Sequence, residues 1–319
     1  MKILITGGAG FIGSNFIEYV GQTIYAHLYD VVVVDSLTYA SDYDRCKELL
    51  DNSNFKSTEL IVADISERST LLNDHVSKAE VIFHFAAESH VDNSIRDASP
   101  FINSNIVGTQ NMIDMAHNGV CNRFMHVSTD EVYGSLSFND ASSTEESPIA
   151  PNSPYSASKA SSDLLVRSYV KTHGFPAITT RCCNNFGKYQ DKEKLIPKMI
   201  DSANNNRTLM VYGTGENIRE WIDVRDHCRA IWFLVRAGEV GEVYNIGTRV
   251  DKTNNVIVGD ICDLMGYDSA QITHVEDRKG HDFRYSINSN KLLSLGFKPK
   301  YNYEETLRDT VKWYTEKKD

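Results

Sequence analysis

The sequence of 319 residues predicts an α/β fold, in which a doubly wound parallel sheet is followed by a smaller mixed α/β lobe. Two observations lead to this prediction. Through the first two-thirds of the chain, short runs rich in Val, Ile, Phe and Thr alternate with segments of helix length, and the runs lack the polar alternation of half-exposed strands. After about residue 182 longer polar loops separate the helical segments, which indicates a smaller lobe packed against the sheet.

The apolar runs place the strands of the sheet, in order, at 2–6, 31–35, 60–64, 81–85, 123–128 and 177–181. Strands joined through helices pair in parallel by right-handed crossovers, and the helices are expected at 11–21, 67–77, 100–117 and 155–173. In the last third we expect strands near 209–212 and 243–246, and helices at 195–204, 225–237, 254–265 and 303–317.

We therefore expect a domain of residues 1–182, whose sheet also receives later segments, and a lobe formed mainly by residues 183–319. The cleft between the two is the expected ligand site, since small-molecule sites concentrate at such boundaries.

Composition excludes several classes of protein. Hydrophobic residues make up 41% and charged residues 24% of the chain, which argues against disorder. The formal charge of -10 argues against nucleic acid or an anionic membrane as partner. No apolar run approaches the roughly 20 residues of a membrane span, and the N-terminus is typical of a strand rather than a signal peptide. Six cysteines without a CxxC pair and ten histidines without HExxH predict reduced thiols, no metal site and a cytoplasmic protein.

A glycine-rich turn follows the first expected strand. It can be read as GxGxxG from Gly8 or as GxxGxxG from Gly7, and both readings end at Gly13. Glycines there permit a tight turn and close approach of a pyrophosphate to a helix N-terminus. Asp35 ends the second strand 22 residues after Gly13, where its carboxylate would bind ribose hydroxyls and repel a 2′-phosphate. The pattern predicts a Rossmann-type domain that binds NAD rather than NADP.

Other strand ends reach the same rim of the sheet, where ligands of open α/β sheets bind. Asp64 and Ile65 follow the third strand and could edge the adenine, and the small residues Ala86 and Ala87 follow the fourth. The residues expected to bind NAD are Gly7, Gly10, Phe11, Ile12, Gly13, Asp35, Ser36, Leu37, Thr38, Asp64, Ile65, Ala86, Ala87, Ser89, Ser104, Tyr155, Lys159 and Asn184.

Tyr155 and Lys159 form a YxxxK pair at the start of an expected helix. The spacing i, i+4 places both side chains on one helix face. A nearby ammonium favours the phenolate and so should lower the pKa of Tyr155 from its usual value of about 10. The pair therefore predicts a tyrosine that acts as a base near neutral pH.

With these motifs in order, the chain resembles the extended short-chain dehydrogenases/reductases and, among them, the nucleotide-sugar 4,6-dehydratases. The resemblance covers essentially the whole chain and rests on the glycine-rich turn and on residues 85–92, 128–134, 154–160, 193–197 and 280–282. It implies a lyase that uses NAD internally on a nucleoside-diphosphate glucose, with dTDP-glucose first and UDP-glucose as the alternative. The product would be a 4-keto-6-deoxy sugar, an early step towards deoxysugars such as rhamnose.

The resemblance also implies the catalytic roles. Oxidation of the C4 hydroxyl to a ketone makes the C5 hydrogen removable, and Tyr155 would take the hydroxyl proton while Thr129 bonds the C4 oxygen. Glu131 would then abstract the C5 proton, and Asp130 would protonate the departing C6 hydroxyl. The two carboxyls need different protonation states, which their environments must supply. Lys159 completes the expected catalytic set.

On the substrate side, the resemblance places Arg219 against the diphosphate, where a guanidinium suits phosphate oxygens. Two departures from the family pattern lie nearby, Glu220 for Asp and Cys183 for Ser. The expected substrate-binding residues are Ser89, Thr129, Asn184, Lys194, Leu195, Tyr212, Gly213, Arg219, Asn254, Asp277, Arg278, Lys279, Gly280 and His281. Relatives form a homodimer through the helices at 100–117 and 155–173, although the apolar residues of these helices are equally explained as intrachain core.

Two other functions fit part of the pattern. A UDP-sugar 4-epimerase shares the fold, NAD and YxxxK, but epimerisation at C4 needs no acid–base pair at C5 and C6. A non-catalytic dinucleotide sensor should lack Tyr155 or Lys159, and both are present.

Overall fold

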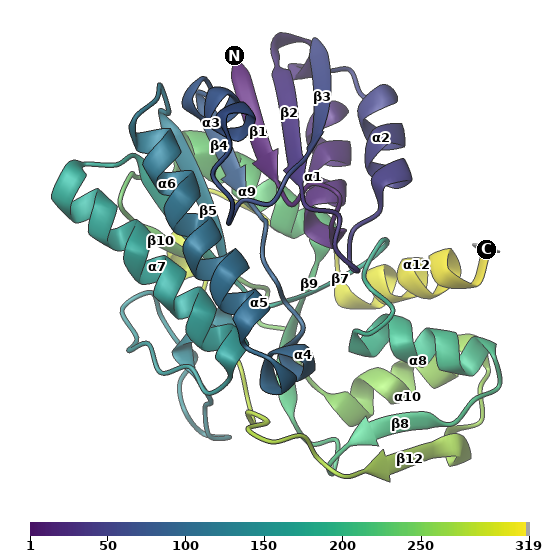
Figure 1. Cartoon of the computed structure of the whole chain (residues 1–319). Helices are drawn as coiled ribbons and strands as arrows, with labels where there is room; N and C mark the ends of the chain where they lie inside the picture. The colour runs from purple at the N-terminus through teal and green to yellow at the C-terminus, as the bar shows by residue number, and fades with distance from the viewer. Residues whose placement is uncertain (317–319) are drawn as a thin grey trace.

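A computed structural model describes residues 1–316 and shows a parallel sheet of seven strands (Figure 1). Its order is β10-β6-β5-β4-β1-β2-β3, and every neighbouring pair is parallel. The predicted fold class is confirmed. The strands are β1 (Lys2–Thr6), β2 (Asp30–Asp35), β3 (Ser57–Val62), β4 (Val81–His84), β5 (Arg123–Thr129), β6 (Ala177–Cys182) and β10 (Val243–Ile246).

Strand β3 begins three residues before its expected start at 60 and ends at Val62. It is the edge strand of the sheet, and its first three residues, 57–59, are exposed. An edge strand accepts polar side chains, so the apolar run reveals only the part of this strand that is covered.

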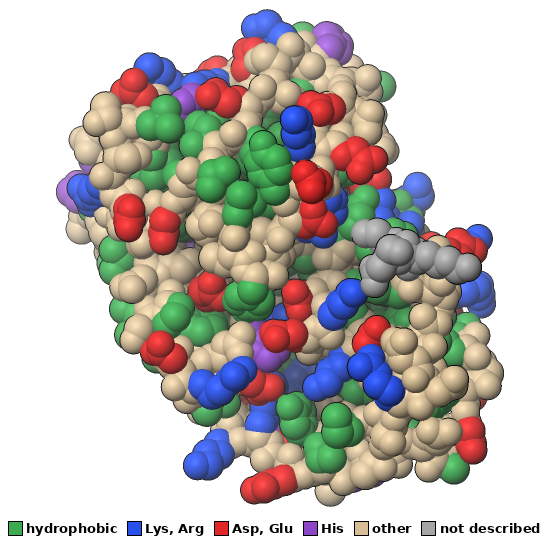
Figure 2. Space-filling view, turned by 45° about the vertical axis from the view of Figure 1, so that its right-hand side comes forward, with side chains coloured by type: hydrophobic (Ala, Val, Ile, Leu, Met, Phe, Trp, Pro, Cys, Tyr) green, Lys and Arg blue, Asp and Glu red, His purple; other side chains and the backbone are tan. Residues whose placement is uncertain are grey.

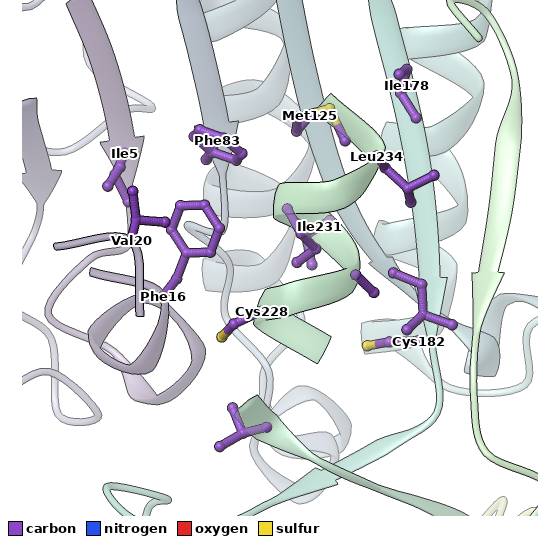
Figure 3. Packing of buried hydrophobic residues seen from close by; sticks show 14 of the residues in the cluster. Ile5, Phe16, Val20, Phe83, Met125, Ile178, Cys182, Cys228, Ile231 and Leu234 are labelled. Atoms are coloured by element: carbon purple, nitrogen blue, oxygen red, sulfur yellow. The ribbon is translucent and has the colours of Figure 1, made fainter. Parts of the chain in front are cut away.

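Helices cover both faces of the sheet (Figure 1). The cluster of Figure 3 packs Phe16 of α1 and Ile231 of α9 against strand residues such as Phe83 and Met125. The opposite face packs on a second cluster, which includes Leu4, Ile82 and Phe124 with residues from three other helices. The first face carries α1 (Phe11–Gly21), α2 (Tyr43–Asp51) and α9 (Val224–Ala237), and the second carries α3 (Thr70–Ser77), α6 (Thr109–His117) and α7 (Pro154–His173).

The helix expected at 100–117 is not uniform. It consists of α5 (Ser99–Phe101), a π-helical segment over Ile102–Gly108, and α6. Inside the π-helical segment, Asn105 accepts from the Glu88 N–H (2.8 Å) and donates to Ser158 Oγ (2.8 Å). The Asn105 side chain therefore links the loop after β4 to α7. A hydrophobic period of 3.6 residues in the sequence does not distinguish this π-helical segment from an α-helix.

Helix α7 positions the YxxxK pair. Ser153 caps its N-terminus, and Ser153 and Ser156 bond each other's backbone N–H groups in a capping box. Pro154 occupies the first turn, where its missing N–H costs nothing, and Gly174 ends the helix in the left-handed region at φ 64°. Tyr155 and Lys159 both lie on the buried face of this helix.

The second lobe has its own core, built around Phe186, Ile200, Trp221, Ile261 and Leu307. The helix expected at 303–317 is observed to Glu316, and residue 317 lies outside the described residues. The lobe contains β7 (Asn184–Phe186), β9 (Ile218–Asp223) and β11 (Asp251–Thr253) in one small sheet, the parallel pair β8 (Leu209–Tyr212) and β12 (Ile272–Val275), and the helices α8 (Leu195–Asn204), α10 (Asn254–Met265) and α12 (Tyr303–Glu316).

Two later segments, α9 and β10, return to the large sheet, so the lobe does not contain all of the chain after residue 182. The division into 1–182 and 183–319 stays a prediction. The described residues also form two short helices, α4 (Val91–Arg96) and α11 (Asn290–Ser294), and 3₁₀ turns at Ala26–Leu28 and Ser269–Gln271.

Within residues 1–316, no helix is both long and apolar enough to cross a membrane. In the same range, no group of three His, Cys, Asp or Glu residues is placed to hold a metal ion. All six cysteines are free.

Candidate active site

A cleft lies at the carboxyl ends of the central strands, as expected for ligands of an open α/β sheet. It extends from the turn after β1 past the ends of β2, β4, β5 and β6 to the first turns of α7. Its lining includes every residue expected to bind NAD except Leu37: Gly7, Gly10, Phe11, Ile12, Gly13, Asp35, Ser36, Thr38, Asp64, Ile65, Ala86, Ala87, Ser89, Ser104, Tyr155, Lys159 and Asn184.

The turn after β1 leaves no room for side chains. Gly7 has φ +69°, and a Cβ there would lie 2.6 Å from the backbone nitrogen of Ala86. A Cβ at Gly13 would lie 2.2 Å from the Gly7 carbonyl oxygen. The backbone of the turn is therefore bare at the start of α1, where N–H groups and the helix dipole favour an anion.

Asp35 is held in place by three donors. Its Oδ2 accepts from the Ala9 N–H (2.9 Å), and its Oδ1 accepts from the Leu37 N–H (2.9 Å) and the Ser41 hydroxyl (2.8 Å). A carboxylate has about four acceptor positions, so capacity remains for a hydroxyl in the cleft. Leu37 itself has φ 54° and packs its side chain on the hydrophobic core, so it orients Asp35 through its backbone instead of lining the cleft.

The YxxxK pair lies in the cleft wall but does not have the expected electrostatics. Lys159 Nζ donates to the Val127 carbonyl oxygen (2.8 Å), and burial lowers the pKa of this ammonium to about 8. Burial also raises the pKa of Tyr155 well above 10, and the charge of Glu131 adds to this, while a hydrogen bond with Thr129 opposes it. The expected lowering of the Tyr155 pKa is thus wrong for the ligand-free chain, because desolvation of the phenolate dominates.

The two adjacent carboxyls lie in a 3₁₀ turn, Asp130–Tyr133, at the end of β5. Thr129 caps this turn by accepting from the Glu131 N–H (3.2 Å), and its hydroxyl donates to Asp130 Oδ1 (3.3 Å). Asp130 is 3% exposed, and its Oδ2 has no hydrogen-bond partner within the described chain. A buried acceptor without a hydrogen-bond partner favours the protonated acid.

The environments of the two carboxyls differ. Burial first, and then the charge of Glu131, raises the pKa of Asp130 well above its usual range. Burial also raises the pKa of Glu131, but Arg278, Arg219 and Lys194 oppose that rise. Asp130 is therefore the group that holds a proton, and Glu131 is the group that ionises more readily.

Three cations of the second lobe, Lys194, Arg219 and Arg278, act on Glu131 and oppose the rise in its pKa that burial causes. Lys194 Nζ donates to the Ser89 carbonyl oxygen (2.8 Å), and an Nη of Arg278 lies 3.5 Å from an Asp92 carboxylate oxygen. Arg219 is buried, donates to the carbonyl oxygen of Asp282 (2.9 Å) and lies 4.4 Å from the centre of the Tyr285 ring. Figure 2 shows several Lys and Arg side chains gathered around a hollow in the lower half of the molecule.

The expected substrate-binding residues are only partly brought together. Ser89, Thr129, Asn184 and Lys194 line the cleft itself. Gly213 packs so tightly on Asp277 that a Cβ would lie 2.7 Å from its carboxylate. The remaining residues lie on the second lobe outside the lining of the cleft: Leu195, Tyr212, Gly213, Arg219, Asn254, Asp277, Arg278, Lys279, Gly280 and His281.

Glu220, which stands where the family pattern has Asp, is fully buried next to Arg219. Its carboxylate accepts from the N–H groups of Thr248 (2.6 Å), Arg249 (2.7 Å) and Ile287 (2.9 Å). This carboxylate fixes β9, and with it the backbone of Arg219, against two other segments of the chain.

Several residues that line the cleft were not expected from the sequence, among them Ser128, Cys182 and Cys183. They lie at or just after the ends of β5 and β6, so the strand-end argument used for Ala86 could have found them. Glu88, Gln190 and Asp191 also line the cleft, and they come from loops whose course a sequence pattern does not fix.

The sequence profile of the GDP-mannose 4,6 dehydratase family matches residues 4–310. The chain belongs to this family. The low-salt glycan biosynthesis protein Agl12 of Haloferax volcanii is 48% identical to it over 98% of each chain. The dTDP-glucose 4,6-dehydratase of Haemophilus influenzae is 41% identical, again over 98% of each chain.

A solved structure of a relative has the same fold as this chain. It is a double mutant of DesIV, a dTDP-glucose 4,6-dehydratase of Streptomyces venezuelae, with NAD bound. The TM-score is 0.92 at 42% identity, and the alignment covers 99% of this chain and 97% of that one.

Proposed function

We propose that this chain is an NAD-dependent hydro-lyase that converts dTDP-glucose to its 4-keto-6-deoxy product. One observation carries the proposal: the Asp130–Glu131 pair lies in the same cleft as Tyr155, Lys159 and a glycine-rich turn suited to a dinucleotide. The names of the relatives at 41–42% identity over the whole chain support the same reaction and nucleotide.

The cleft fits NAD. The bare backbone of Gly7, Gly10 and Gly13 would hold the pyrophosphate, and Asp35 would hold the adenosine ribose. A carboxylate at that position disfavours a 2′-phosphate. Bound NAD supplies the hydride acceptor for oxidation at C4 and the hydride donor for reduction at C6.

The side chains of the cleft move the protons. Tyr155 takes the proton of the C4 hydroxyl, and the Lys159 ammonium one helical turn away favours the phenolate against the cost of burial. Once C4 is a ketone, the C5 hydrogen is α to a carbonyl and Glu131 removes it as a proton, and it returns a proton to C5 when C6 is reduced. Asp130, which holds a proton, gives it to the C6 hydroxyl as water leaves.

The diphosphate lies among the cations of the second lobe. Lys194 lines the cleft, and Arg219 and Arg278 lie close enough to oppose the rise in the Glu131 pKa. These cations bond two backbone carbonyl oxygens and the Asp92 carboxylate. When the substrate binds, its phosphate oxygens would take the place of such acceptors.

The assembly we propose is a cytoplasmic homodimer formed through α6, α7 and the segment before α6. Ile113 and Val166 of these helices are buried in the core of the chain, so they are not available to a partner. Ile102, Val107 and Leu164 are 48%, 41% and 52% exposed, and these apolar side chains are the ones a second copy would cover.

A panel of four nucleotide sugars tests the proposal. The chain is incubated with NAD and dTDP-glucose, UDP-glucose, CDP-glucose or GDP-mannose, and the products are analysed by mass spectrometry. We expect loss of one water from dTDP-glucose, together with the absorbance of a 4-keto sugar in alkali. A product of unchanged mass would indicate an epimerase. Turnover of UDP-glucose alone would mean that the substrate nucleotide is UDP and not dTDP.

A further inference from the structure

Behind the YxxxK pair, a third polar residue lies on the same face of α7. Tyr155, Lys159 and Asp163 follow one another at spacings of four residues, which places them in one row, and all three are less than 9% exposed. Tyr155 and Lys159 line the cleft, whereas Asp163 does not. An aspartate buried behind a reactive ammonium needs an explanation, because an unpaired buried charge is costly.

Asp163 is held from the two strands beneath it. His126 Nε2 of β5 lies 3.1 Å from its Oδ1, and the Arg181 Nε–H of β6 donates to its Oδ2 at 2.9 Å. Arg181 is itself packed over the ring of Tyr133 at 4.8 Å. Neighbouring residues of β5 hold the two charged groups. The carbonyl oxygen of Val127 binds the Lys159 ammonium, and His126, the residue before Val127, binds the Asp163 carboxylate.

The other titratable groups around Lys159 carry no negative charge at neutral pH. Burial raises the pKa of Cys182, on β6, to about 12, so this thiol is neutral. Burial lowers the pKa of His84, on β4, and of His126, so both rings are neutral. Tyr155 is protonated, and Arg181 is a second cation. Burial raises the pKa of Asp163, but its hydrogen bond with His126 and its attraction to Arg181 outweigh burial and lower the pKa. Asp163 is therefore the ionised carboxylate beside Lys159.

We propose that Asp163 is a positioning residue for the reaction: its carboxylate, fixed by His126 and Arg181, keeps Lys159 charged and thereby prepares Tyr155 to accept a proton. The role of the ammonium in turnover rests on the proposed function, but the effect of Asp163 on Lys159 is a property of the ligand-free chain. Burial brings the pKa of Lys159 down to about 8, so a small change in its surroundings decides whether it is charged at neutral pH.

The ionisation of Lys159 is measured directly in the full-length, ligand-free chain by NMR titration of lysines labelled with ¹⁵N, with the signal assigned from its loss in Lys159→Met. In Asp163→Asn the midpoint is expected to fall by at least about one pH unit, a tenfold change in the ionisation equilibrium. In His126→Leu, which removes a neutral partner that fixes the carboxylate, the midpoint should fall in the same direction. A structural role alone would leave the midpoint unchanged in both folded variants.

Asp114→Asn is the matched control, because Asp114 also bonds a residue of α7, Tyr169, and an arginine, Arg68, but is not among the groups that act on Lys159. Its titration should match the wild type. Asp163→Glu, which keeps the negative charge, should have a midpoint close to that of the wild type. An unchanged midpoint in folded Asp163→Asn overturns the proposal. If that variant does not fold, His126→Leu decides: a lower midpoint supports the proposal, and an unchanged or higher midpoint overturns it.

Turnover of dTDP-glucose then separates the two proposals. With an active wild type, the rate of C4 oxidation in Asp163→Asn should fall at least about fivefold at pH 8 and much less at pH 6.5, because acid restores the ammonium. An inactive wild type would refute the proposed function while leaving the NMR result intact. Equal losses at both pH values would overturn the positioning role.

Discussion

At the scale of single residues, the central feature is that two adjacent carboxyls have different environments. Asp130 is buried and has an oxygen without a partner among the described residues, whereas three cations act on Glu131. The sequence showed the pair but could not show which member keeps its proton. Burial and the cations of the second lobe decide that, and these become visible only when the chain is folded.

Glu131→Gln should stop the reaction after oxidation at C4, because an amide cannot take the C5 proton. We expect exchange of the C5 hydrogen with deuterated water to fall by a factor of at least about 100, the usual contribution of a general base. Mass spectrometry of the recovered sugar measures the exchange. Asp130→Asn is the comparison, and it should keep the exchange but lose water elimination. Exchange at the wild-type rate in Glu131→Gln would mean that another residue is the base.

Asp130 should also make stability depend on pH. Its folded-state pKa is raised, so the native chain holds a proton that the unfolded chain releases above about pH 3.9. The free energy of unfolding should therefore decrease as pH rises, by up to about 1.4 kcal/mol per pH unit for this group. In Asp130→Asn that contribution disappears. Urea unfolding at pH 5 and pH 6 measures it, and parallel pH dependence in both proteins would contradict the assigned pKa direction.

At the scale of elements, the turn from β1 into α1 is where the sequence was most informative. Glycine is required there by contact distances that a pattern of glycines encodes directly. The π-helical segment before α6 was not predictable, because Ile102–Gly108 has the same apolar pattern as an ordinary helix. Lys159 illustrates a third case: its position on the helix was predicted, but its bond to the Val127 carbonyl oxygen was not.

Gly13→Ala tests the turn. The new Cβ would lie 2.2 Å from the Gly7 carbonyl oxygen and 2.7 Å from Gly8 Cα, so the backbone facing the pyrophosphate must move. We expect NAD to bind at least about tenfold more weakly, which is about 1.4 kcal/mol. Isothermal titration with NAD measures the affinity. Gly259→Ala, in α10, is the matched control because its Cβ would meet no atom within 4 Å, and it should bind NAD normally. Equal affinities in the two variants would mean that the turn does not hold the cofactor.

At the scale of the whole molecule, the sequence predicted the layers but not the route of the chain. The six strands from β1 to β6 are recognisable as apolar runs, and their ends meet at the rim where the cleft lies. The return of α9 and β10 to the large sheet depends on packing between distant segments, which no local pattern records. For the same reason the family resemblance suggested Arg219 as a phosphate ligand but could not show its bonds to backbone carbonyl oxygens.

In the reaction that we propose, one cleft performs oxidation, loss of water and reduction on the same bound sugar. The most direct test follows tritium placed at C4 of dTDP-glucose through a single turnover with the wild-type chain. We predict that the label leaves C4 and is recovered at the C6 methyl group of the same product molecule. Label that is found in water, or that remains at C4, would contradict the account.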